Sequence, residues 1–326
     1  MRRRVRRGAR RYRRKFRRGA RRYIRRSMTR RKVADISSSK MRDNMAATPI
    51  ADGGAEGEIG DPAIITSEAS AAILFCPSAR GAQWSEGESE YSRQKTEVYA
   101  KGYLENVTIE TIGPGNWRWR RIVFQCHSQD IISTYPQNTM ANYDNANGYK
   151  RAMLPITSGS SNIAGYQAVL RQLFQGTLGY DYGDVYVAPV DRNRNRVLMD
   201  RSMPVRSGNS KGIWKNQRDY VAINKKLRYD EKEQGQGKEP LSDVIAGRQN
   251  YTWFTTPTRY TGGDVYVFDL FSCADTSDGG VNQLHFRAHG TWFGMRGKLI
   301  YPGYGGVYID KNKICVQPII LCSVFS

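Results

Sequence analysis

Cysteine and histidine are scarce in this sequence. Its 326 residues include five cysteines and three histidines. The cysteines are odd in number and no two lie closer than seven residues: Cys76, Cys126, Cys273, Cys315 and Cys322. This spacing argues against a disulfide framework and against a Cys-x-x-Cys zinc site. We therefore expect reduced thiols, mostly in the core of a protein that folds inside a cell.

Long apolar runs are absent as well. None approaches the roughly 18 residues that a transmembrane helix needs. The N-terminus is basic, but no apolar segment follows it, so it does not have the pattern of a secretory signal. We expect neither a membrane-spanning helix nor secretion through such a signal.

The motifs of the common enzyme classes are missing too. His285 and His289 are four residues apart but lack the Glu of a zinc-protease motif, and His127 beside Cys126 has no third ligand placed by sequence. The stretch nearest to a phosphate-binding loop, residues 235–239, has Glu where a hydroxyl is required. We expect no metal site, no cofactor and no enzymatic activity.

Acidic residues are absent from the N-terminus, where basic residues are dense. Residues 1–32 contain 19 Lys or Arg, and the first carboxylate is Asp35. The whole chain has 51 basic and 30 acidic residues, so the remainder has 32 against 30 and is nearly neutral. A polycationic tail on a neutral body predicts a polyanionic partner, nucleic acid first and an anionic membrane second.

The basic arm, residues 1–34, contains an internal repeat. The heptapeptide Arg-Arg-Gly-Ala-Arg-Arg-Tyr occupies residues 6–12 and returns at 17–23, a period of 11 residues. Apolar side chains recur every three or four residues, which is helical spacing. The arginines repel one another and the two glycines weaken a helix, so we expect a disordered arm in the free protein. Bound phosphates would screen the repulsion and could allow the arm to form a helix.

The chemistry of the arm suits single-stranded nucleic acid. Guanidinium groups pair with phosphates, and interleaved aromatic rings stack on bases without reading their sequence. The predicted nucleic-acid-binding residues of the arm are Arg2, Arg3, Arg4, Arg6, Arg7, Arg10, Arg11, Tyr12, Arg13, Arg14, Lys15, Phe16, Arg17, Arg18, Arg21, Arg22, Tyr23, Arg25, Arg26, Arg30, Arg31 and Lys32.

The rest of the chain is predicted to be a linker, residues 35–62, followed by one β-rich domain, residues 63–326. One segment, 163–175, has the spacing of an amphipathic helix. Short β-segments separated by Gly, Pro, Asn and Asp predict a sandwich or jelly roll. The expected strands are residues 71–76, 98–109, 117–125, 184–190, 219–229, 263–273, 284–293 and 313–324.

A second candidate for nucleic-acid binding lies in that body. In a strand, Trp117, Trp119 and Arg121 share one face, and Arg118 and Arg120 share the other. Aromatic rings beside guanidinium groups fit a base-stacking platform, whereas the alternative is an ordinary strand with core tryptophans and solvated arginines. Weaker candidates are the loop 192–196 and the basic stretch 225–228, each of which contacts DNA or is simply exposed.

Two stretches carry a family resemblance. Residues 219–239, DYVAINKKLRYDEKEQGQGKE, and residues 262–273, GGDVYVFDLFSC, resemble segments of the coat proteins of geminiviruses and genomoviruses, with an echo at 183–187. The Arg-Arg-Tyr-Arg-Arg arm is similar to that group as well. The resemblance covers the arm and roughly the C-terminal half, and a genomovirus-like coat is preferred.

The resemblance implies an all-β single jelly roll, an eight-stranded antiparallel sandwich with one or two short helices in its loops. It further implies an icosahedral shell of sixty copies, an arm that faces the interior and packages single-stranded DNA, and a nuclear localisation signal read by a host import receptor. The protein would then reside in the virion and, during assembly, in the host nucleus. The expectation that the packaged nucleic acid is DNA rather than RNA rests on this resemblance alone.

Three other functions stay open at this point. A non-assembling basic nucleic-acid-binding protein, such as an RNA chaperone or ribosomal protein, would form small oligomers that coat strands. A nuclease would need His285 or His289 for metal-dependent cleavage. Insertion of the arm into a membrane as a basic helix is at most a secondary activity, because the apolar face of the arm is thin. We expect no stable membrane insertion.

Overall fold

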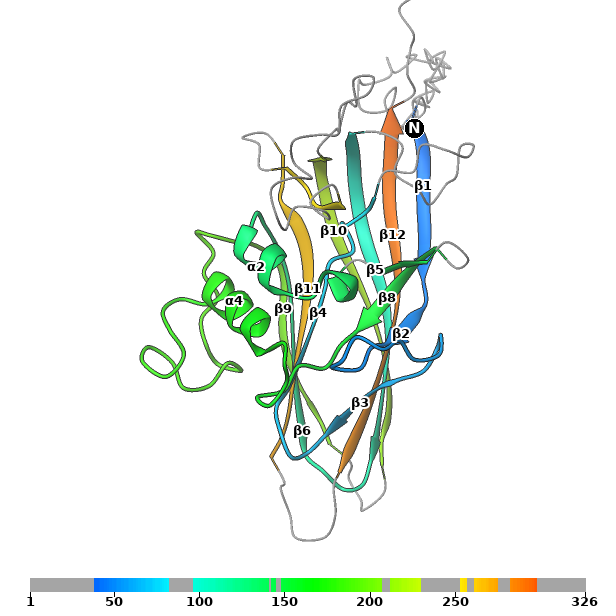
Figure 1. Ribbon diagram of the computed structural model, residues 1–326. Coiled ribbons are helices and arrows are strands. Elements are labelled where there is room, and N and C mark those ends of the chain that lie inside the picture. The colour runs from blue at the N-terminus through cyan, green and yellow to red at the C-terminus, as the bar shows by residue number, and fades with distance from the viewer. Residues whose placement is uncertain are drawn as a thin grey trace, which may run out of the picture. The chain divides into compact units, whose positions relative to one another are not determined.

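The computed structural model describes residues 38–81, 96–140, 142–144, 148–206, 212–229, 253–256, 261–274 and 282–297. This part of the chain is mostly β-structure, and its long strands pair antiparallel (Figure 1). The prediction of an all-β protein is thus confirmed at the level of fold class. The basic arm and the expected strand 313–324 lie outside the described residues.

The first sheet has five strands in the order β1-β12-β5-β10, with β3 beside β12 as well. Strands β1 and β3 follow each other along one edge of β12, because they pair with different halves of it. The bounds are β1 Ser38–Met45, β3 Ala63–Thr66, β5 Glu97–Ile112, β10 Trp214–Arg228 and β12 Gln283–Gly297.

The second sheet has four strands in the order β4-β11-β6-β9. Its strands are β4 Ala71–Phe75, β6 Trp117–Cys126, β9 Arg196–Val205 and β11 Asp264–Cys273. Across both sheets the pairings are nested: β1 pairs with β12, β4 with β11, β5 with β10 and β6 with β9. The chain therefore folds back on itself as one long antiparallel ribbon.

Aromatic side chains fill the space between the two sheets. The ring of Trp119 stacks on Phe271 with centroids 6.3 Å apart, and Phe271 meets Phe286 from the other sheet edge-on at 5.1 Å. All three are fully buried. Burial of each such side chain contributes about 2–3 kcal/mol relative to exposure, so this cluster is a major source of cohesion between the sheets.

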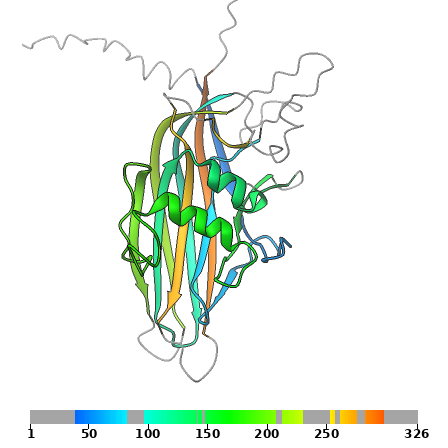
Figure 2. The ribbon, with the colours of Figure 1, turned by 60° about the vertical axis from the view of Figure 1, so that its left-hand side comes forward.

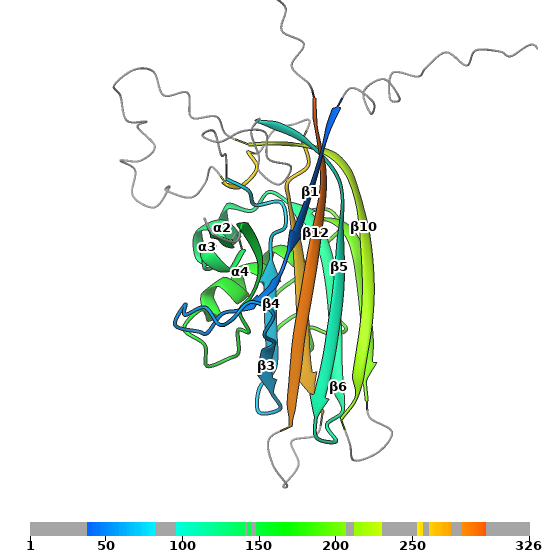
Figure 3. The ribbon, with the colours of Figure 1, turned by 90° about the vertical axis from the view of Figure 1, so that its right-hand side faces the viewer.

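Helices cover the other face of the second sheet, as Figures 2 and 3 show. They are α2 Gln129–Thr134, α3 Gln137–Met140 and α4 Ile163–Leu173. Helix α4 buries Val169, Leu170 and Leu173 in one cluster with Phe268 and Leu270 of β11. A strand buried on both faces favours a continuous apolar run, which β4 has and which Asp269 alone interrupts between Val265 and Phe271 of β11.

The predicted linker, residues 35–62, is wrong from Ser38 onward. Strand β1 pairs with β12 over eight residues, and β2 Ala47–Pro49 pairs in parallel with β8 Gly148–Met153. A short strand, β7 Asn142–Asp144, completes this third sheet. The polar composition misled the prediction, because only Met41 and Met45 of β1 carry apolar side chains into the core.

Most predicted strands of the body are confirmed within a few residues, as is the helix over 163–175. The predicted strand 184–190 is wrong. There Asp184 Oδ1 accepts from the backbone N–H of Tyr186 at 2.9 Å, and its carbonyl oxygen accepts from the backbone N–H of Ala188 at 3.1 Å. An aspartate that bonds its own backbone favours a turn, which overrides the β-propensity of Val185 and Val187.

Candidate nucleic-acid interface

The predicted nucleic-acid-binding residues fall into two groups. Those of the arm, from Arg2 to Lys32, lie outside the described residues, so their contact with nucleic acid stays a prediction. Those of the body, residues 117–121, lie on β6 and alternate between the two faces of its sheet as expected. Only this second group can be placed in the fold.

The predicted stacking platform on β6 is wrong. Trp117 is 1 % exposed and Trp119 is fully buried, and both pack in the core between the sheets. The indole Nε1–H of Trp119 donates to Asp269 Oδ1 at 2.8 Å. Neither ring is accessible for stacking on a base. The alternative interpretation is right about the core tryptophans and wrong about solvated arginines, because Arg120 and Arg121 are buried as well.

Arg121 is also buried, and carboxylates surround it. Its Nε and Nη2 donate to the two oxygens of Asp269 at 2.7 and 2.9 Å. Its Nη1 lies 2.6 Å from Glu105 Oε2 and donates to Asp219 Oδ2 at 3.3 Å. Asp269 belongs to the second sheet, whereas Glu105 and Asp219 belong to the first. The guanidinium therefore joins the two sheets through charge.

A second buried arginine extends this network. Arg151 Nε donates to Glu105 Oε1 at 2.7 Å, and Tyr103 Oη donates to the same oxygen at 2.9 Å. Burial alone would raise the pKa of Glu105, but Arg121 and Arg151 outweigh it and hold that pKa below its usual value. The carboxylate is thus ionised, and its charge is balanced inside the protein rather than offered to a ligand.

The remaining arginines of this strand secure a neighbouring loop. Arg120 donates to Asp200 Oδ2 at 2.8 Å and to the carbonyl oxygens of Val185 and Ala188 at 2.6 and 3.0 Å. Arg118 donates to Asp184 Oδ2 at 3.0 Å. Both cations have acidic partners, so neither is an unneutralised charge for a phosphate.

Two residues of the loop 192–196, Arg194 and Asn195, have a structural role. Arg194 donates to the carbonyl oxygens of Arg171 and Phe174, at 2.8 and 3.0 Å, where helix α4 ends. The amide of Asn195 donates to the carbonyl of Gln172 at 2.7 Å. These bonds satisfy orphan carbonyls of the helix C-terminus. Arg192, in the same loop, is exposed.

The basic stretch 225–228 lies on β10 beside a bulge. Asn224 has a φ of 50°, and the register with β5 shifts between Ala222 and Lys225. Lys226 lies 3.5 Å from Glu97, and Arg228 is exposed. The prediction of a strand here is confirmed, and its residues divide between the faces: Lys226 and Arg228 are exposed, whereas Leu227 is buried in the core.

No catalytic or metal centre is visible in the described part of the chain. It contains no cluster of three or more His, Cys, Asp or Glu side chains able to hold a metal. His285 and His289 share the outer face of β12, with His289 exposed. Among the same residues, no helix has the length and apolar character to cross a bilayer.

The buried carboxylate of Asp264 has a strongly raised pKa, and perturbed pKa values are common in active sites. Burial raises the pKa of Asp264 to about 7 against the opposing hydrogen bonds. Those bonds come from the backbone N–H of Thr255, at 3.1 Å, and from Ser78 Oγ, at 3.2 Å. Asp264 is fully buried, so no substrate reaches it, and we interpret it as a structural group.

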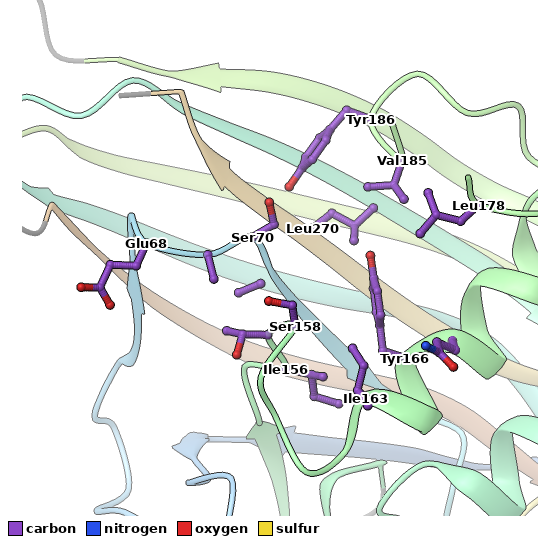
Figure 4. Close-up of a pocket in the computed structure, with 14 residues that line it drawn as sticks. Glu68, Ser70, Ile156, Ser158, Ile163, Tyr166, Leu178, Val185, Tyr186 and Leu270 are labelled. Carbon is purple, nitrogen blue, oxygen red and sulfur yellow. The ribbon is translucent and has the colours of Figure 1, made fainter. Parts of the chain in front are cut away.

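The best-formed cavity is a groove of about 580 Å³ between helix α4, the loop at Val185 and strand β11. Figure 4 shows the hydroxyls of Tyr166 and Tyr186 among apolar side chains such as Ile163 and Leu270, with further polar groups on Glu68, Ser70 and Ser158. Burial raises the pKa of Tyr166 to about 12, so its hydroxyl stays neutral. The lining contains no Lys, Arg or His, so it offers no ion pair and no imidazole to activate its serine hydroxyls.

No model of a known protein family matches the chain, and no curated protein matches it either. The function proposed below therefore rests on the charge distribution of the sequence and on the fold of the body.

Proposed function

We propose that the chain is the coat protein of a small virus with a circular single-stranded DNA genome. The observation that carries the proposal is the separation of charge. An acid-free arm with 19 basic residues is joined to a body of 32 basic and 30 acidic residues. A shell needs a neutral body that packs against copies of itself, and packaging needs a polycation that neutralises phosphates.

The strand order supports a jelly roll within the all-β class. In chain order, the eight strands β1, β4, β5, β6, β9, β10, β11 and β12 pair first with last, second with seventh, third with sixth and fourth with fifth. The additional pairings β12·β5 and β11·β6 roll this ribbon into two sheets. Such a rolled ribbon is the arrangement of jelly-roll shell domains.

Exposed apolar side chains support self-assembly. Val187 is 76 % exposed in a loop beside helix α4, and Ile64 is 53 % exposed on β3. A monomeric protein has little use for such side chains, whereas subunit contacts bury them. In the simplest icosahedron, sixty copies would bring sixty arms to the interior.

The proposal includes the partners and the location. Single-stranded DNA is the bound polyanion, copies of the chain are the protein partners, and a host import receptor reads the arm before assembly. The protein acts in the virion and in the host nucleus and is not an enzyme.

Electron microscopy of the purified protein tests this function. The full chain and a variant lacking residues 1–34 are each examined with and without single-stranded DNA. We expect closed particles of uniform size, with nuclease-protected DNA inside only when the arm is present. Small soluble oligomers under every condition would reject the coat assignment.

The second candidate is a non-assembling nucleic-acid-binding protein, which the arm favours equally. It predicts filaments or beads of protein along single strands, whose length follows the strand and which never close. The same micrographs separate the two candidates, because a closed shell has one diameter whatever the length of the DNA.

A further inference from the structure

The first sheet has an open face. Along β5 and β10, buried and exposed side chains alternate, as expected for a sheet covered on one side only. Figure 3 shows the second sheet and the helices on one side of β12, β5 and β10, and no described element on the other. We call the exposed side, formed by β1, β12, β5 and β10, the outer face.

Basic side chains outnumber acidic ones on the outer face. The two acids, Glu97 and Glu110, lie 3.5 Å from Lys226 and 3.4 Å from Arg287. The basic side chains of this face are Lys40, Arg42, Arg218, Lys226, Arg228 and Arg287. In the interior, by contrast, carboxylates surround the buried arginines. The outer face therefore has a surplus of positive charge, whereas the buried arginines are neutralised by carboxylates.

Aromatic rings lie among these charges in a row that crosses four strands. The guanidinium of Arg42 on β1 lies 6.0 Å from the ring centre of Phe293 on β12. Tyr220 on β10 meets Phe293 at 6.4 Å, edge-on. It does so above Gly102 of β5, where an added Cβ would lie 2.5 Å from the Tyr220 hydroxyl. The absence of a side chain at Gly102 therefore lets the two rings meet.

The row remains accessible to a ligand. Tyr220 is 54 % exposed, and Phe293 is partly exposed. Further aromatic side chains, Tyr99 and Trp214, lie towards the two ends of the face, and Trp214 is 70 % exposed. Exposed rings flanked by cations are the composition of a surface that stacks bases and tracks phosphates.

We propose that the outer face is a second contact surface for single-stranded nucleic acid, with the row Arg42–Phe293–Tyr220 stacking on bases and the surrounding cations binding phosphates. This extends the proposed function, since it assigns the body a share of the strand that the arm binds. Stacking has no sequence preference, as packaging of a whole genome requires.

A subunit interface is the other use for an exposed sheet face, and its chemistry would differ. Interface cores are depleted in charged residues. On the outer face, exposed cations lie on both edge strands, with Arg42 on β1 and Arg218 on β10. Two copies packed through this face would bring like charges together. A polyanion relieves that repulsion, and therefore we favour it as the occupant.

Photo-crosslinking tests the proposal without any substitution in the protein. Full-length protein is irradiated with oligodeoxynucleotides that carry 5-bromodeoxyuridine, and the attached peptides are identified by mass spectrometry. We expect attachment at Tyr220 or Phe293 in addition to the arm. Attachment in the arm alone would overturn the proposal and leave the proposed function intact.

Affinity measurements supply the second readout. Fluorescence anisotropy with labelled oligothymidylate of about 15 nucleotides, a length suited to one binding surface, compares the full-length chain with R42Q/Y220A. We expect about ten-fold weaker binding by the variant, the loss of roughly one stacked base. The matched control is R171Q/Y180A, whose changes lie away from the outer face and leave the affinity unchanged.

Each other outcome has a distinct meaning. Unchanged oligothymidylate affinity with loss of particles in R42Q/Y220A would overturn the proposal in favour of a subunit interface. Equal weakening by the control pair would overturn it too, because general charge or folding would then explain the loss. Failure of the unaltered chain to bind any oligonucleotide would instead reject the proposed function itself.

Discussion

Arg121 and Asp269 lie directly opposite each other on neighbouring strands, and two hydrogen bonds of 2.7 and 2.9 Å join the guanidinium to both carboxylate oxygens. Both side chains are fully enclosed between the sheets. A charge pair with this geometry offsets the cost of burying either partner, but only while both are present.

Replacement of Arg121 by Met should therefore be costly. It leaves Asp269 and Glu105 buried without their closest common cation, and loss of one partner of a buried pair typically costs about 3–5 kcal/mol. Urea unfolding followed by tryptophan fluorescence measures the change in the free energy of unfolding. The control is Arg118→Ala on the same strand, whose ion pair with Asp184 is half exposed and contributes about 0–1 kcal/mol. Equal losses in both variants would contradict the role assigned to the buried network.

Asp264 predicts a pH dependence of stability. Its pKa is about 7 in the folded protein against 3.8 for an ordinary aspartate, so the folded state holds a proton that the unfolded state has lost between these values. This group therefore lowers stability as the pH rises from about 4 to 7, by up to roughly 4 kcal/mol, and has no further effect above that range.

Asp264→Asn removes this titration. We expect the variant to lose less stability than the unaltered protein between pH 5 and pH 8, because its side chain stays neutral throughout. Thermal melts at several pH values give the comparison, with Asp52→Asn at an exposed carboxylate as the control. Parallel pH profiles for D264N and the unaltered chain would show that Asp264 is ionised across this range.

The loop 192–196 allows a direct test of the structural interpretation against the nucleic-acid one. Arg194→Ala removes two bonds to carbonyls at the end of helix α4, so we expect the melting temperature to fall by roughly 2–4 °C. Affinity for oligothymidylate should stay unchanged. Arg192→Ala, two residues away and exposed, should alter neither property. A drop in affinity with no change in melting temperature for R194A would restore the DNA-binding hypothesis for this loop.

The arm predicts a measurable salt dependence. Replacing the four arginines of the second repeat, Arg17, Arg18, Arg21 and Arg22, by Gln removes four phosphate contacts. The slope of log affinity against log salt concentration should become shallower by about 3, since each contact on a single strand contributes about 0.7. Anisotropy titrations at several salt concentrations measure it. An unchanged slope would mean that these arginines do not meet phosphates.

The sequence predicts the elements of this fold better than it predicts their environment. The alternation of Trp119 and Arg120 follows from the period of a strand, and the structure confirms it. The burial of both faces of β6 does not follow from that period. The acidic partners of Arg121 are distant in the chain: Asp269 becomes its neighbour through sheet pairing and Glu105 through packing of the two sheets. A basic and aromatic stretch therefore looks like a binding surface until its acidic partners are located.

The outer face was missed for the same reason. Arg42, Phe293 and Tyr220 lie on three strands from opposite ends of the chain, and no local motif connects them. Strand β1 itself was assigned to a linker, because its alternation is mostly between polar residues. A surface whose residues come together only through strand pairing has no signature in the local sequence. Gly102, in the middle of β5, is the one hint, because a glycine inside a strand often marks the close approach of another group, here Tyr220.

Strand β1 has a mechanical consequence for whatever the arm binds. It pairs with β12 over its whole length, from Ser38 opposite Gly297 to Met45 opposite Gly290. A pulling force along the axis of β1 would load the β1–β12 ladder in shear. Its hydrogen bonds would then have to break together and not one after another. Strand β12 is in turn paired on both edges, which spreads the force into the whole first sheet. Strand β1 is thus held by a ladder that resists a pull along its axis.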